Sequence, residues 1–158
     1  MPDLATHLLA VTPFLKRTVR RPELVLLGAV LPDLVGRMSL LLPERPFFFW
    51  ADTALHTPFS AALVILGLAL LFPEDRRREA ILSLGFGAAF HFALDMMQRS
   101  VTFGTPWLFP FSMASFQLPI IWGDESFYAL PALILINFLV FRRPLLARLR
   151  AIRRRRGA

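Results

Sequence analysis

Long apolar runs alternate along this chain with short stretches that carry proline and arginine. The runs cover residues 3–15, 24–42, 54–72, 80–97 and 126–141. A helix that spans a hydrocarbon core of about 30 Å needs roughly 20 mainly apolar residues. The last four runs reach or approach that length, whereas the first is shorter and contains Pro13. The pattern therefore predicts an all-α integral membrane bundle of about four to five transmembrane or membrane-embedded helices.

Composition supports a membrane location. Of the 158 residues, 56% are hydrophobic and 18% are charged, whereas soluble domains usually carry about 25% charged residues. The chain has no cysteine, which excludes disulfides, thiolate metal sites and a cysteine nucleophile within it. No segment resembles a cleaved signal peptide. We expect one membrane-embedded domain over residues 1–141, followed by a basic cytoplasmic tail over residues 142–158.

Basic residues gather in three clusters, within residues 16–21, 76–78 and 142–156. Cytoplasmic loops of membrane proteins carry an excess of lysine and arginine. We therefore expect all three clusters inside the cell and loops 43–53 and 98–125 outside, in a multi-pass protein of the inner (cytoplasmic) membrane. A basic run directly after a membrane helix attracts anionic lipid, so the tail predicts a lipid partner and no nucleic acid.

Ionisable residues are costly inside a membrane and usually mark functional sites. Every histidine of the chain lies in or at the end of an apolar run, together with two aspartates: His7, His56, His91, Asp33 and Asp95. In the predicted topology most of these lie near the outer ends of their runs, and Asp33 lies near mid-membrane. There Pro32 disturbs the helix, and Gly28 and Gly36 allow close packing. We expect the five side chains to converge on one cavity that opens outward.

Imidazole nitrogens and carboxylate oxygens are ligands that zinc prefers. His91 and Asp95 are four residues apart, which places both on one face of a helix. A bound zinc lowers the pKa of its water to around 7 and so creates a nucleophile at neutral pH. If Asp95 bridges two ions, a second ion held with His7 can stabilise the leaving oxygen of a phosphoester.

Explanations without a metal exist for the single residues. Arg37 follows Asp33 by four positions, and Arg99 follows Asp95 by four, so each aspartate can form an intrahelical ion pair. The same two arginines can instead hold a substrate phosphate beside the metal.

The histidines also have simpler explanations. His7 can be an interfacial or capping residue. His56 can be a loop residue before a helix that begins at Thr57 and Pro58, with threonine as N-cap and proline in the first turn. None of these explanations accounts for the absence of histidine from the polar parts of the chain.

Five short motifs resemble, in their order, the YdjM-like membrane-bound metal-dependent hydrolase family of bacteria and archaea. They are MPDLATHLL, GAVLPDL, ALHTPFS, GAAFHFALD and LFPFS, within residues 1–128. That family is distantly similar to the zinc phospholipase C and single-strand nuclease superfamily of helical phosphoesterases. The resemblance implies one or two zinc ions, because a further histidine and glutamate that complete a third site there have no counterpart here. It also implies a bridging carboxylate at Asp95 and the ligand set His7, Asp33, His56, His91 and Asp95.

Together, the residues and the resemblance predict a membrane-bound metal-dependent hydrolase with its site on the extracytoplasmic side. Asp95, Arg37 and Arg99 are the predicted catalytic groups, and the substrate is a phosphoester of a lipid or lipid-linked molecule. The aromatic loop 98–125 is a candidate substrate contact or an interfacial anchor. The alternatives are a metal or proton transporter, whose inner half would need ligands that this chain lacks, and a scaffold with a structural metal.

The predicted orientation can be tested with single cysteines in this cysteine-free chain. Cysteines introduced near Pro46 and Gln117 should react with an impermeant reagent added outside the cell, and one near Arg77 should not. Labelling near Arg77 from outside would overturn the placement of the site.

Overall fold

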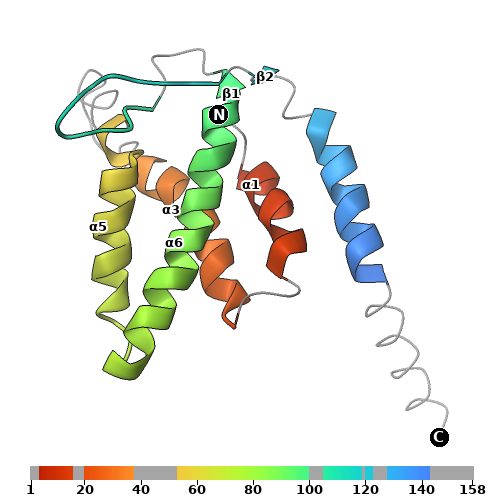
Figure 1. Cartoon of the computed structure of the whole chain (residues 1–158). Helices are drawn as coiled ribbons and strands as arrows, with labels where there is room; N and C mark the ends of the chain where they lie inside the picture. The colour runs from red at the N-terminus through yellow and green to blue at the C-terminus, as the bar shows by residue number, and fades with distance from the viewer. Residues whose placement is uncertain are drawn as a thin grey trace, which may run out of the picture.

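The computed structural model describes residues 4–15, 20–37, 53–99, 105–118, 120–122 and 128–142. Most of these residues are helical, as predicted (Figure 1). Two short strands, β1 (Gln98–Arg99) and β2 (Ile121–Trp122), pair in parallel. The helical elements are α1 (Leu4–Val11), the 3-10 helix η1 (Thr12–Phe14), α3 (Pro22–Arg37), α5 (Pro58–Ala69), α6 (Glu74–Met97) and an apolar helix at Tyr128–Arg142.

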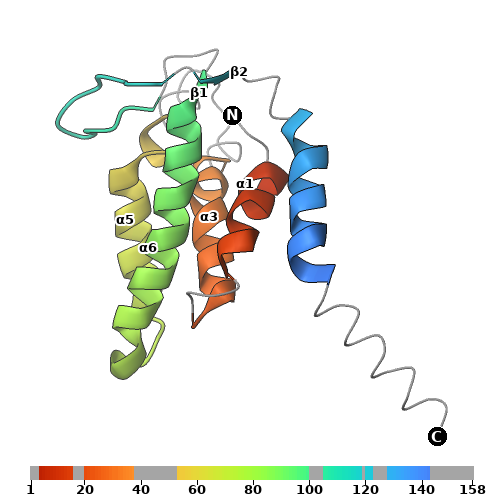
Figure 2. The same cartoon turned by 45° about the vertical axis from the view of Figure 1, so that its right-hand side comes forward.

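The helices form a bundle around the pair α3 and α6, which begin at the same end of the molecule (Figure 1). Helix α5 packs on α6 and α3, and α1 packs on the same two helices. The last helix lies beside α1 in both views (Figure 2). There the Asn137 side-chain amide donates a hydrogen bond to the carbonyl of Leu9, with 2.8 Å between nitrogen and oxygen.

Helix α5 begins as its sequence predicts. Thr57 is the N-cap, and its side-chain oxygen accepts a hydrogen bond from the backbone N–H of Ser60 at 3.2 Å. Pro58 occupies the first turn, where its missing N–H leaves no hydrogen bond unmade. This start fixes the position of His56, directly before the cap.

Helix α6 begins at Glu74, six residues before the apolar run that predicted it. Glu74 and Asp75 lie in its first turn, where negative charge favours the helix dipole. Arginines 76–78 therefore belong to the helix itself, and not to a loop before it.

Helix α6 is the one helix, among the residues described, that is long and apolar enough to cross a membrane by length and composition. The helices at Leu4–Phe14, Pro58–Ala69 and Tyr128–Arg142 are apolar but shorter. The all-helical bundle is thus as predicted, whereas the number of membrane spans stays a prediction.

The backbones of α3 and α6 touch at two glycines. A Cβ atom on Gly28 would lie 2.1 Å from the carbonyl oxygen of Leu84, and one on Gly87 would lie 2.1 Å from that of Val25. Only glycine permits so close an approach. The close packing expected at Gly28 is confirmed, and Gly87 is a partner that the sequence analysis missed. Gly36 is buried, and its role in packing stays a prediction.

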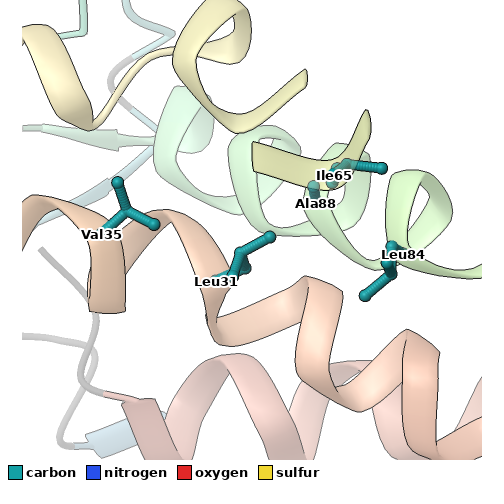
Figure 3. Close-up of a cluster of buried hydrophobic side chains, with 5 residues drawn as sticks. All are labelled: Leu31, Val35, Ile65, Leu84 and Ala88. Atoms are coloured by element: carbon teal, nitrogen blue, oxygen red, sulfur yellow. The ribbon is translucent and has the colours of Figure 1, made fainter. Parts of the chain in front are cut away.

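Apolar side chains fill the space on both sides of this contact. One cluster joins α3, α5 and α6 through Leu31, Val35, Ile65, Leu84 and Ala88 (Figure 3). A second cluster joins α1 to α3 and consists of Val11, Val25 and Ala29. The core therefore holds together the four segments that carry the five predicted ligand residues.

A pair of glycine substitutions in α6 tests the backbone contact. Gly87→Ala should lower the free energy of unfolding by about 3 kcal/mol, because its methyl group meets backbone that cannot rotate away. Gly85→Ala is the matched control, since a Cβ there has nothing within 4 Å. It should raise stability by up to about 1 kcal/mol, the usual gain from replacing a helical glycine. Chemical unfolding in detergent measures both, and equal effects would contradict the contact.

Candidate metal centre

The five predicted ligand side chains meet at one end of the bundle. Helix α1 contributes His7, α3 contributes Asp33, and the residue before the α5 N-cap is His56. Helix α6 contributes both His91 and Asp95. All five side chains are nearly inaccessible, with exposed fractions between 0% and 6%. The expected convergence is therefore present, although the site is buried.

Asp95 contacts all three histidines. Its Oδ2 atom lies 2.8 Å from His56 Nε2 and 3.1 Å from His91 Nε2. Its Oδ1 atom lies 3.4 Å from His7 Nε2. The two carboxylate oxygens thus face different imidazoles, an arrangement that allows one carboxylate to serve two neighbouring ions.

Asp33 approaches the same imidazoles from α3 at longer distances. The shortest is 3.6 Å, from Asp33 Oδ1 to His56 Nδ1, and the others are 3.9 Å to His91 Nε2 and 4.0 Å to His7 Nδ1. These separations exceed ordinary hydrogen-bond lengths. They are also somewhat longer than the spacing of ligand atoms around a tetrahedral zinc, which is about 3.3 Å for bonds of 2.0–2.1 Å.

The ligand atoms form two overlapping groups. His7, His91 and Asp95 make one, and Asp33, His56 and His91 make the other, with ligand atoms within 4.8 Å of one another in each. Three protein ligands with one position left open is the arrangement of catalytic zinc sites. The cluster could therefore hold a metal ion in either group.

The orientation of the His91 ring is set by the backbone of α3. Its Nδ1 atom lies 2.8 Å from the carbonyl oxygen of Ala29. Because a carbonyl only accepts, Nδ1 carries a hydrogen, and Nε2 is directed at the cluster. Nε2 faces the Asp95 carboxylate at 3.1 Å and His56 Nε2 at 3.4 Å. Such outer hydrogen bonds to a backbone carbonyl are usual for metal-binding histidines.

Several atoms of the cluster are buried without a hydrogen bond. Among the described residues these include both ring nitrogens of His7, Oδ2 of Asp33 and Oδ1 of Asp95. Each buried unsatisfied polar group costs about 1–3 kcal/mol. A divalent cation satisfies imidazole nitrogens and carboxylate oxygens together, so the residues present fit a metal ion.

The predicted phosphate-binding arginines follow the two aspartates. Arg37 is the last residue of α3, and Arg99 lies in β1 directly after α6. Their side chains lie outside the described residues, so their role stays a prediction. Both oxygens of each aspartate face histidine nitrogens, which is the arrangement expected of metal ligands.

Two contributors to the site were missed from sequence: the carbonyl of Ala29 and the glycine at position 87. A backbone carbonyl leaves no signal in a sequence. Gly87 had one, because it lies one helical turn before His91 and so shares its face.

A protein-family model described as YdjM inner membrane protein matches residues 4–156. The match covers all five residues of the cluster. No curated protein and no solved structure matches the chain. The distant similarity to zinc phospholipase C enzymes therefore stays a prediction.

Metal content of purified variants tests the ligand assignment. The unaltered protein should retain zinc or a similar divalent ion, measured by mass spectrometry of the metal. Asp95→Asn and His91→Ala should each lower zinc affinity by more than about tenfold. Loss of a residue that only hydrogen-bonds to a metal ligand already lowers metal affinity by about 10–100-fold. Glu74→Gln is the matched control at the exposed start of the same helix and should retain the metal.

The ion-pair explanation makes a different prediction for Asp95→Ala. If that carboxylate only neutralised Arg99, removing both partners would restore stability, since an unpaired buried charge is the main cost. For a metal ligand, Arg99→Ala added to Asp95→Ala should restore no metal. Recovered metal in the double variant would refute the assignment.

Proposed function

The chain belongs to the YdjM inner membrane protein family, and we propose that it is a metal-dependent hydrolase of that membrane. The observation that carries the proposal is the buried group of three histidines and two aspartates, several of whose polar atoms have no hydrogen bond among the described residues. An apolar bundle retains such a costly cluster when the cluster has a function. We propose as substrate a phosphoester of a lipid or lipid-linked molecule, since a site within a membrane bundle meets such molecules first.

In this proposal His7, Asp33, His56, His91 and Asp95 hold one or two divalent ions, with zinc the ion that suits these donors. When bound, the metal supplies the Lewis acidity that activates water at neutral pH. Asp95 has the most exposed side chain of the five, at 6%, and its two oxygens face different histidines. It is the residue best placed to join two ions and to face the substrate.

The His91 ring is held in one orientation by its bond to Ala29. This bond leaves Nε2 directed at the cluster and removes the need for the ring to reorganise when an ion binds. Arg37 and Arg99 follow the two aspartates at the same end of the bundle, where guanidinium groups can bind a phosphate in bidentate fashion.

We further propose that the loop after α6 contacts the substrate. It is tied to the end of that helix, because the Leu118 N–H donates to the Met96 carbonyl at 2.8 Å. Trp107 packs edge-on against Phe92, with ring centroids 6.0 Å apart. Phe92 in turn packs edge-on against His56 and His91. A continuous chain of rings therefore links the loop to the metal ligands.

The solvent-exposed side chains of this loop are strongly apolar. Leu108, Phe111 and Met113 are 64%, 91% and 52% exposed. Residues 100–123 contain no Asp, Glu, Lys, Arg or His. Such a surface suits the bilayer interface, which supports a lipid as substrate or at least as neighbour.

We propose a multi-pass topology with the cluster on the extracytoplasmic side. Helices α3 and α6 begin at one end of the bundle, where the last helix also ends (Figure 2). Arg20, arginines 76–78 and Arg142 are located at those helix ends. Asp33 and Asp95 lie near the opposite ends of α3 and α6. This separation supports the positive-inside orientation. The basic tail after residue 142 lies outside the described residues, and anionic lipid remains its proposed partner.

A structural metal is the second candidate, because no ligand side chain is more than 6% exposed. A closed site without room for water would hold the bundle together and catalyse nothing. The transporter alternative has less support: within the described ranges, metal-ligand groups are found only at one end of the bundle.

Activity distinguishes the two candidates. Zinc-loaded protein in lipid nanodiscs should release phosphate or a phosphorylated headgroup from at least one member of a panel of phosphorylated lipids. His91→Ala and Asp95→Ala should each lower the rate of lipid hydrolysis by more than about 100-fold. This exceeds the usual effect of losing a residue that only hydrogen-bonds to a metal ligand. Glu74→Gln should keep the rate. Retained metal with no turnover of any lipid would favour the structural role.

A further inference from the structure

A second site candidate lies at the other end of the helix pair. An open hollow of about 640 Å³ is formed by the start of α3 and the start of α6. Its charged lining residues are Arg20, Asp75, Arg78 and Glu79, and its apolar ones include Val25, Leu82 and Phe86. Arg78 and Asp95 are separated by about 25 Å along α6, at a rise of 1.5 Å per residue. The hollow is therefore distinct from the metal cluster.

Two arginines and two carboxylates line this hollow, and each carboxylate pairs with an arginine outside the lining. Glu79 pairs with Arg21, whose Nε lies 3.7 Å from its carboxylate and which also pairs with Glu23 at 3.6 Å. Asp75 pairs with Arg76 at 3.8 Å. Within the described part of the chain, Arg20 and Arg78 have no carboxylate at ion-pair distance. Two guanidinium groups are thus left to attract an anion.

The apolar part of the hollow continues along α6. Leu82 and Phe86 follow Arg78 by one and two helical turns, toward the middle of the helix. Leu82 is 61% exposed and Phe86 is 47% exposed. A ligand for this surface needs a negative group at the helix end and a hydrocarbon chain beside it.

We propose that this hollow binds one anionic phospholipid. The phosphate contacts Arg20 and Arg78, where guanidinium groups offer paired donors to phosphate oxygens. An acyl chain lies against Leu82 and Phe86. Basic pockets between membrane helices commonly bind acidic lipid headgroups. A free phosphate ion matches the arginines but leaves the apolar surface uncovered, so a lipid is the better match.

Such a lipid contacts both α3 and α6, the helices whose backbones touch at Gly28 and Gly87. A ligand that binds only the folded state raises its stability. Anionic lipid should therefore stabilise the bundle in a saturable way, independently of any hydrolysis at the metal cluster.

The full chain, purified in a neutral detergent, provides the test. Native mass spectrometry should detect one tightly bound phosphatidylglycerol and much weaker binding of phosphatidylcholine. Arg20→Gln with Arg78→Gln should weaken phosphatidylglycerol binding by about thirtyfold, at about 1 kcal/mol per arginine. Arg77→Gln with Arg142→Gln removes the same charge from residues that do not line the hollow, and the carboxylate partner of Arg77 is Glu74, which does not line it either. That control should change the affinity by less than about threefold.

Further measurements distinguish a lipid site from general charge attraction. Phe86→Ala should weaken phosphatidylglycerol binding, and millimolar inorganic phosphate should not displace the lipid. Equal losses in the two double arginine variants, or full displacement by phosphate, would overturn the proposal. Thermal unfolding of the lipid-free variants confirms that they fold. Their zinc content should stay unchanged, which separates this result from the outcome at the metal cluster.

Discussion

The direct contact between the backbones of α3 and α6 determines most of what lies around it. Gly28 and Gly87 leave no room for a side chain between the two helices. One residue beyond Gly28, the Ala29 carbonyl therefore comes within 2.8 Å of His91. One turn beyond Ala29, Asp33 approaches the same ring nitrogen of His91, Nε2, that Asp95 contacts. The distances of the candidate metal centre follow from how closely these two backbones pack.

The cluster held by this contact contains buried polar atoms that a bound ion would satisfy. Within the part of the chain that the structure describes, both nitrogens of His7 and one oxygen of each aspartate are buried without a hydrogen bond, and each such group costs about 1–3 kcal/mol. The four segments that contribute ligands are otherwise joined by apolar packing. A bound ion would remove the cost and cross-link the same segments, so metal binding and stability should be coupled. A cluster of ionisable side chains inside an otherwise apolar core is the kind of exception that is expected at functional sites.

The two ends of the bundle have different chemistry. One end combines the buried histidines with an uncharged loop, tied to α6 and linked through Trp107 and Phe92 to the ligands. The other end carries arginines, two of which border a hollow without a carboxylate partner among the described residues. The first arrangement suits chemistry on a lipid phosphoester, and the second suits recognition of an anionic headgroup. Both depend on α3 and α6, because each end of this helix pair forms part of one site.

Residue type and hydropathy are local properties, so the sequence by itself determined the helical runs, the start of α5 at Thr57 and Pro58, and the set of five candidate ligand residues. The apolar pattern placed the start of α6 too late. The first turns of the helix, from Glu74, are charged, and a search for apolar runs does not include them although they are helical. Only the tertiary structure decided that Gly87 faces Val25, that Ala29 orients His91, and that Asp33 and Asp95 approach the same three imidazoles. Those contacts depend on how far apart two helices pack and how each is rotated about its axis. Spacing along one chain specifies a face of a helix but not the neighbour that the face meets.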